Sequence, residues 1–296
     1  MRRKIQGWVC ACLWLAAAGF ASPAAWADAQ TLKSGYAAAQ QRLRDSPFHR
    51  PLYLESTESS GALKGEVYAL VEHPYATVQQ ALAAPAHWCE LLLLQPNIKQ
   101  CRVEGEGAAA RLAVNLGRRF DQPIEKTYLA EFSFAAAQST PEYFQVQLDA
   151  GKGPVGTHDY RIMLEAMPVA GGKTYLHLAY SYGYGFTARL ATQAYLSTSG
   201  SGKIGFTVTG KDEHGAPEYI DGLRGAVERN AMRYYLAIDA YLGVAQVPDA
   251  QRFEQSLQRW YDAIEQFPRQ LKEDDRSAYV TVKRGEYQRQ LVAQRS

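Results

Sequence analysis

The residues best suited to acid–base chemistry lie near the middle of the chain. His158 is followed directly by Asp159, and His177 falls on the next expected strand. A histidine oriented by a carboxylate can act as a general base. No G-x-S-x-G motif accompanies them, so the nucleophile of a hydrolase is missing. Histidines in such positions are more often surface or satisfied groups, and we assign no catalytic residue.

Other motifs of chemical interest are weaker still. Residues 200–203 read Gly-Ser-Gly-Lys, but a phosphate-binding loop needs a glycine where Ser197 stands and a Ser or Thr in place of Ile204. This segment is typical of a hairpin turn. No Cys or His spacing matches a zinc site. The sequence therefore gives no reason to expect a cofactor or a metal.

The N-terminus has the pattern of a secretory signal peptide. Basic residues 2–4 precede an apolar run, Trp8–Phe20, which is short for a membrane span, and Ala25-Trp26-Ala27 offers a cleavage site. We expect a cut after Ala27 and a periplasmic or secreted protein; an uncleaved N-terminal anchor is the alternative. Later apolar runs are too short to span a bilayer.

Charge and cysteine content fit an exported protein. The formal net charge is +2 for the whole chain. Loss of the three basic residues of the leader makes it −1, which gives no global attraction to nucleic acid. Cys89 and Cys101 are the cysteines that remain, and an oxidising compartment favours a disulfide between them. The bridge would stabilise the fold by about 3 kcal/mol; two buried free thiols are the alternative.

Hydrophobic periodicity predicts an α+β protein with antiparallel strands. A strand from Leu63 ends at His73-Pro74, and a helix from Tyr75 is split by Pro85. Gly183 and Gly185 suggest a bend or bulge in the longest strand. The remaining expected segments are a helix (29–44), a polar linker (55–61), strands (99–104, 111–116, 128–134, 143–148, 160–166 and 174–186), a hairpin (194–208), a long helix (from 221 to 243), a further helix (249–267) and a charged, partly disordered tail (from 272).

This order of elements resembles the START-like (SRPBCC, helix-grip) superfamily. The likeness covers roughly Leu63 to Val244 and rests on GEVYALVEHPYATVQQALAAPAHWCELL, on the strands through YSYGYG, and on GAVERNAMRYYLAIDAYLG. It implies a curved antiparallel sheet wrapped around a long C-terminal helix, with extra helices at both ends. The chain then divides into a signal peptide (1–27), an N-terminal helix and linker (28–60), a START-like domain (61–245) and a C-terminal helical extension and tail (246–296).

The resemblance implies a cavity between the sheet and the long helix that binds a lipid or another apolar small molecule. Tyrosine suits an amphipathic ligand, because its ring packs against apolar groups while its hydroxyl reaches a polar head. Such residues are also common in plain cores, and a one-residue register error would exchange the two faces. The candidate lining residues are Phe132, Phe134, Phe144, Tyr180, Tyr182, Tyr184, Tyr234, Tyr235, Ile238 and Tyr241.

Three functions are open at this stage. The first is a periplasmic carrier or sensor of an apolar or lipid-like molecule. The second is an enzyme of the cyclase or hydratase kind found in the same superfamily, which would place His158 or His177 in the cavity beside a carboxylate. The third is an interaction module that docks a protein partner through the helices at its two ends. The sequence identifies no such partner.

Overall fold

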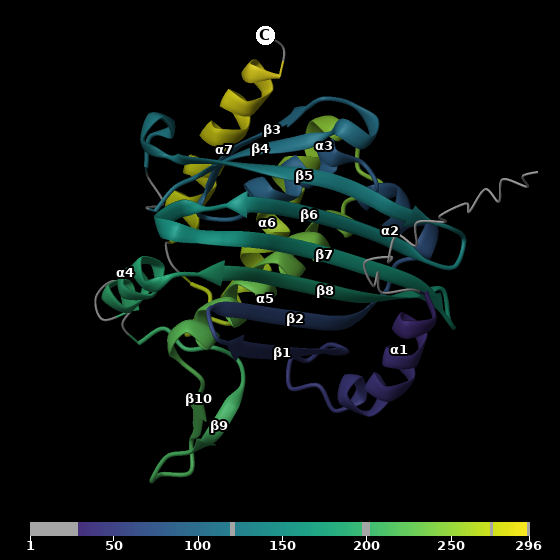
Figure 1. Ribbon diagram of the computed structural model, residues 1–296. Helices are drawn as coiled ribbons and strands as arrows, with labels where there is room; N and C mark the ends of the chain where they lie inside the picture. Colours follow the sequence, from purple (N-terminus) through teal and green to yellow (C-terminus); the bar gives the residue numbers. More distant parts are fainter. Residues whose placement is uncertain (1–28, 119–121, 197–201, 273–274, 295–296) are drawn as a thin grey trace, which may run out of the picture.

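The structure is a computed structural model that describes residues 29–118, 122–196, 202–272 and 275–294. The expected signal peptide lies outside these residues. One antiparallel sheet dominates the described chain, with strand order β1-β2-β8-β7-β6-β5-β4-β3 (Figure 1). Its strands are β1 (Leu52–Ser59), β2 (Ala62–Val71), β3 (Ile98–Glu104), β4 (Arg111–Leu116), β5 (Tyr128–Ser139), β6 (Phe144–Lys152), β7 (Thr157–Val169) and β8 (Lys173–Tyr184).

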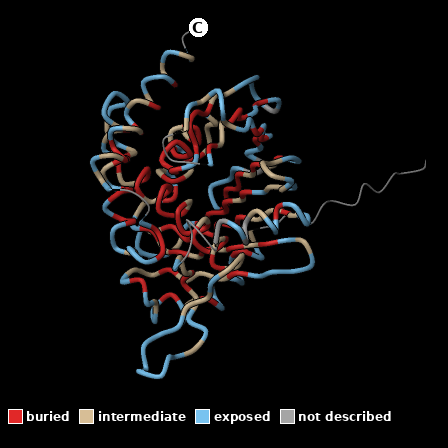
Figure 2. Tube along the Cα trace, turned by 90° about the vertical axis from the view of Figure 1, so that its left-hand side faces the viewer, coloured by how far each residue is buried: buried red, intermediate tan, exposed pale blue. Residues whose placement is uncertain are grey.

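Helices pack on the sheet, and the longest of them, α5, lies behind it in Figure 1. The helices are α1 (Ala29–Arg44), α2 (Tyr75–Leu82), α3 (Pro85–Leu93), α4 (Phe186–Leu196), α5 (Gly222–Leu242), α6 (Asp249–Glu265) and α7 (Arg276–Ala293), with short 3-10 turns η1 (Gly107–Ala109), η2 (Ile124–Lys126) and η3 (Pro154–Gly156). A curved antiparallel sheet around a long C-terminal helix is the helix-grip architecture, so the expected fold class is confirmed. Figure 2 shows the buried residues concentrated inside this arrangement.

Helix α5 does not cover the sheet evenly. It packs on β1, β2 and β8. It comes close to β2 at Gly65, where a Cβ would lie 3.0 Å from the Ala231 Cβ and from the Val227 carbonyl oxygen. Only glycine permits the helix to sit this close. The strands at the other end of the sheet curve away from α5, and the space left there becomes the site described below.

Register shifts interrupt the pairing of the β3–β4, β5–β6 and β7–β8 pairs. The β7–β8 register shifts between His158 and Arg161, and the β3–β4 register shifts between Ile98 and Gln100. Such bulges bend a strand and increase its twist. The sequence suggested a bulge near Gly183; the bulge is in the partner strand, and Gly183 leaves room for the His158 ring, which a Cβ would approach to 2.3 Å.

The interpretation of residues 55–61 as a linker is wrong. Most of them belong to β1, which pairs with β2 along its whole length. The strand was hidden because its inward position is filled by a small polar residue, Ser56, instead of an apolar one. Ser56 is buried and donates to the Glu228 carboxylate of α5 at 2.6 Å.

The hairpin expected over residues 194–208 is also wrong. Residues 194–196 end helix α4, and residues 197–201 lie outside the described chain. The hairpin in this region comes later, between β9 (Val208–Lys211) and β10 (Pro217–Tyr219). Buried Glu228 attaches the preceding chain to α5, since it accepts hydrogen bonds from the main-chain N–H groups of Phe206 at 2.6 Å and Thr207 at 2.9 Å.

The charged tail forms helix α7 instead of the disorder we expected. Two of its charged side chains, Lys283 and Glu286, are buried beside the edge strand β3: Lys283 donates to the Gln95 and Ile98 carbonyl oxygens at 2.6 and 2.8 Å and to Glu286 at 2.7 Å. Glu286 also pairs with buried Lys99 at 3.2 Å. Composition alone could not reveal this, because the charges satisfy main-chain groups at the start of β3 that would otherwise be buried without partners.

Candidate functional site

A cavity of about 520 Å³ lies where the sheet leaves α5. We call it the chamber. Its walls come from the start of β3, from β4 to β8, from the chain between β4 and β5 including η2, from helix α3 and the η3 turn, and from one residue of α5. The lining residues are Leu92, Asn97, Ile98, Val114, Leu116, Gly117, Arg118, Gln122, Lys126, Thr127, Tyr128, Phe132, Leu148, Pro154, Val155, Tyr160, Ile162, Tyr180 and Tyr234.

The chamber combines an aliphatic wall with a group of tyrosines. Tyr180 of β8 lies 5.1 Å from Tyr234 of α5 and 6.4 Å from Tyr160 of β7, measured between ring centroids. Burial raises the pKa of all three hydroxyls. They therefore stay protonated and cannot serve as bases near neutral pH. The Tyr160 hydroxyl donates to Thr157 Oγ1 at 2.9 Å, so Tyr180 and Tyr234 are the two that can donate a hydrogen bond to a ligand.

A second cavity of about 220 Å³ adjoins the chamber. We call it the vestibule. The two share Asn97, Arg118, Tyr180 and Tyr234, so one molecule could occupy both. The other residues that line the vestibule are Gln95, Pro96, Ala226, Arg229, Asn230 and Arg233.

Exposed apolar side chains lie beside the chamber. Helix α4 packs against η3, whose Pro154 and Val155 line the wall. On α4, Phe186 is 82% exposed and Leu190 is 57% exposed. The two residues are four apart and so share one face of the helix.

Of the residues expected to line a cavity, the structure brings Phe132, Tyr180 and Tyr234 together around the chamber. Tyr182 is half-buried and stacks on Tyr160 with ring centroids 5.3 Å apart. Tyr241 borders a separate pocket of about 140 Å³. The others lie elsewhere, in the core or at its margin: Phe134, Phe144, Tyr184, Tyr235 and Ile238. Ligand contact by any of the ten stays a prediction.

Sequence reasoning missed much of the wall. Tyr160 and Ile162 lie in the expected strand 160–166, and Val114 and Leu116 lie in the expected strand 111–116, but the candidates contain only aromatic residues and Ile238. The same strand alternation that identified Phe132 could have found these residues. By contrast, Pro154 and Val155 carry no periodic signal, because they stand in an irregular turn with a positive φ at Val155.

Neither candidate histidine opens into the chamber. His177 is buried on the opposite face of β8 from Tyr180, among residues covered by α1. Its Nδ1 lies 2.8 Å from Glu165 and its Nε2 lies 2.9 Å from Glu66. His158 is exposed and pairs with Asp159 at 2.8 Å. The arrangement that an enzyme would need, a cavity histidine beside a carboxylate, is therefore not made by either of them.

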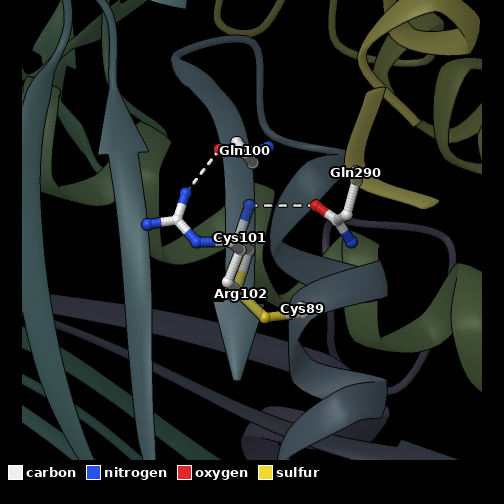
Figure 3. Close-up of a disulfide and its surroundings, with 5 residues drawn as sticks. All are labelled: Cys89, Gln100, Cys101, Arg102 and Gln290. Carbon is white, nitrogen blue, oxygen red and sulfur yellow. Dashed lines mark hydrogen bonds between the residues drawn. A yellow bond between two sulfur atoms is a disulfide. The ribbon is translucent and has the colours of Figure 1, made fainter. Parts of the chain in front are cut away.

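The disulfide expected from the sequence joins Cys89 of α3 to Cys101 of β3, with Cα atoms 5.1 Å apart (Figure 3). From the same residue of β3, the Cys101 N–H donates to Gln290 of α7 at 2.9 Å. Edge strand β3 is thus fixed by a covalent bond to one helix and by a side chain of another. Because Leu92 of α3 and Ile98 of β3 line the chamber, the bridge also holds its wall.

Within the residues that the structure describes, no helix is long and apolar enough to cross a membrane. The same residues contain no cluster of three or more His, Cys, Asp or Glu side chains able to hold a metal ion.

Comparisons with known proteins show a likeness at the level of structure. No protein-family model matches the chain, and no curated protein does. It is similar to norcoclaurine synthase from Thalictrum flavum, with 14% identity over 51% of this chain and 80% of that one and a TM-score of 0.34. It is also similar to Ara h 8.0201, with 14% identity over 62% of this chain and 98% of that one and a TM-score of 0.37. A third similar structure is a conserved protein of unknown function from Enterococcus faecalis, with 8% identity over 77% of this chain and 97% of that one and a TM-score of 0.35.

Sequence identities and TM-scores this low do not support any conclusion about the activity of this protein. The fold class rests on the strand order and on the long helix α5 themselves. The chain is a helix-grip protein with a cavity between sheet and helix, and membership of the START-like superfamily stays a prediction.

Proposed function

We propose that this protein is an exported carrier or sensor that binds a lipid or another apolar small molecule in the chamber. The observation that carries the proposal is the chamber itself, a cavity of about 520 Å³ lined mainly by the sheet, with Leu92 of α3 and Tyr234 of α5. Ligand sites of this kind span roughly 300–1,000 Å³ and combine apolar walls with a few placed polar groups. An apolar chain that enters such a site gains about 0.8 kcal/mol for each buried CH₂ group.

The composition of the wall supports binding more than catalysis. Leu92, Val114 and Ile162 offer apolar contact, while the hydroxyls of Tyr180 and Tyr234 can orient a polar group. The cyclase or hydratase alternative was tied to His158 or His177 in the cavity, and both lie outside it. We therefore prefer a binding protein.

Export is the second part of the proposal. It is supported by the signal-peptide pattern of residues 1–27 and by the Cys89–Cys101 bridge, because disulfides persist mainly in oxidising compartments. Expression of the full chain in a bacterium, followed by cell fractionation and intact-mass measurement, tests it. We expect a periplasmic or secreted product that starts at Asp28; a cytoplasmic product of full mass would contradict export.

Ligand binding is tested by native mass spectrometry of the purified protein, with organic extraction of whatever is bound. We expect a stoichiometric apolar adduct, or uptake of added long-chain amphiphiles with displacement of Nile red. A protein that carries no adduct and takes up none of them would overturn the proposed function.

A further inference from the structure

The hydroxyl of Tyr234 belongs to the place where the two cavities join. Tyr234 lines both the chamber and the vestibule, and its ring lies 5.1 Å from the ring of Tyr180, measured between centroids. Among the residues that the structure describes, the Tyr234 hydroxyl makes no hydrogen bond. Polar groups inside a protein are almost always hydrogen-bonded. The partner of this hydroxyl therefore comes from whatever occupies the cavities.

Tyr180 adds a second donor beside the first. Burial raises the pKa of Tyr180, and a hydrogen bond with the Asn230 side chain acts against that rise. A hydrogen bond that lowers the pKa of a hydroxyl is one that its oxygen accepts, so the Asn230 amide is the donor. The proton of Tyr180 then stays available for another acceptor. Both tyrosines can thus donate to the same region of the cavities.

A carbonyl oxygen matches two such donors. It has two lone pairs and brings no proton of its own. An alcohol oxygen also accepts, but its proton needs a further acceptor once it leaves water. Aliphatic side chains of the chamber wall, such as Leu148 and Ile162, offer apolar contact to the rest of the molecule.

A charged head group is less suited to this place. An ion that leaves water costs far more free energy than a neutral group unless it is paired. The buried arginines of the vestibule already have partners in the protein, since Arg229 and Arg233 each donate to a main-chain carbonyl at 3.3 Å. Arg118 and Lys126 of the lining are exposed, and exposed ion pairs contribute little.

We propose that the ligand carries an uncharged carbonyl group, of a ketone or an ester, whose oxygen accepts hydrogen bonds from the Tyr234 and Tyr180 hydroxyls while the apolar remainder lies in the chamber. This rests on the proposed function and names the class of molecule that the same site takes. The two hydroxyls orient the ligand, and burial of the apolar remainder supplies most of the binding free energy.

The test uses three ligands of matched size in Nile red displacement: decan-2-one, 2-methyldec-1-ene, in which C=CH₂ replaces C=O, and decanoate. We expect Tyr234→Phe to weaken binding of the ketone about five- to tenfold, through loss of one hydrogen bond, and to change binding of the alkene less than about twofold. Tyr180→Phe should act in the same direction. The native sequence should bind the ketone at least about tenfold more tightly than decanoate. The control Tyr175→Phe, on the opposite face of β8, should leave all three affinities unchanged.

The outcomes separate the two proposals. If both phenylalanine variants weaken the ketone and the alkene equally, or weaken neither, the carbonyl contact is overturned and an apolar binding protein still stands. Tighter binding of decanoate than of the ketone would overturn the uncharged head. Failure of all three ligands to bind the native sequence would overturn the proposed function itself. The two variants change different layers of the fold, so Tyr180→Phe decides the matter even where Tyr234→Phe fails to fold.

Discussion

Tyr180 and Tyr234 lie 5.1 Å apart between ring centroids, one on the sheet and one on α5, at the place where the chamber meets the vestibule. This pair joins the two layers of the fold across the candidate site. Burial keeps both hydroxyls protonated by raising their pKa. The pair is thus suited to hold the polar end of a ligand without taking part in proton transfer.

Removal of one hydroxyl tests that role. Tyr234→Phe keeps the ring contact and should change the free energy of unfolding by less than about 1 kcal/mol. Ligand affinity should fall about five- to tenfold, which corresponds to the loss of one hydrogen bond. Tyr175→Phe is the matched control, because Tyr175 is buried on the opposite face of β8. Calorimetric titration of both variants decides; unchanged affinity in Tyr234→Phe would remove the hydroxyl from the site.

Two neighbouring positions of β7 distinguish the chamber from the solid core. Ile162 lines the chamber, whereas Leu164 is fully buried and does not. Ile162→Phe should fill empty space, lower ligand affinity at least tenfold and leave stability nearly unchanged. Leu164→Phe should overpack the core and cost about 1–3 kcal/mol. Urea unfolding and Nile red binding measure the two effects, and equal destabilisation by both variants would show that the chamber wall is already filled.

The disulfide should contribute to stability through its loop. Cys89 and Cys101 are 12 positions apart in sequence, and the chain-entropy relation assigns a loop of about this length roughly 3 kcal/mol. Cys89→Ala with Cys101→Ala should lower the free energy of unfolding by about that amount. A reductant should destabilise the native sequence equally and leave the double variant unaffected. A reductant that has no effect on the native sequence would show that the bond contributes nothing.

The sequence allowed the fold class and most elements to be predicted, because strands such as 160–166 and the helix from Asp221 have strong periodic patterns. The prediction from sequence failed at buried polar residues that hold parts of the fold together. Ser56 occupies an inward strand position, and Lys283 with Glu286 forms the buried face of α7. Both satisfy groups from distant parts of the chain, which no local pattern reveals. The vestibule was missed for the same reason, since Arg229 and Arg233 look like solvated helix charges.

His177, which is buried on the face of β8 opposite Tyr180, should make the free energy of unfolding depend on pH. Burial disfavours the charged form of His177, but hydrogen bonds to Glu165 and Glu66 outweigh it and raise its pKa above 6.5. A pKa that is higher in the folded state means that the folded protein binds the proton more tightly. The stabilisation is complete below about pH 6.5 and is lost as pH rises through the raised value.

His177→Gln should therefore be less stable than the native sequence at pH 6, and the gap should narrow toward pH 9. Glu66 gives the opposite trend in acid: burial raises its pKa, hydrogen bonds from His177 and Lys64 lower it to about 2, and its contribution fades as pH falls from about 4.5 toward 2. Urea unfolding at pH 6, 7.5 and 9 measures the gap, and the same change at exposed His158 is the control. A gap that stays constant from pH 6 to 9 would mean that His177 is neutral between its carboxylates, and that the ion pairs on this face do not stabilise the sheet.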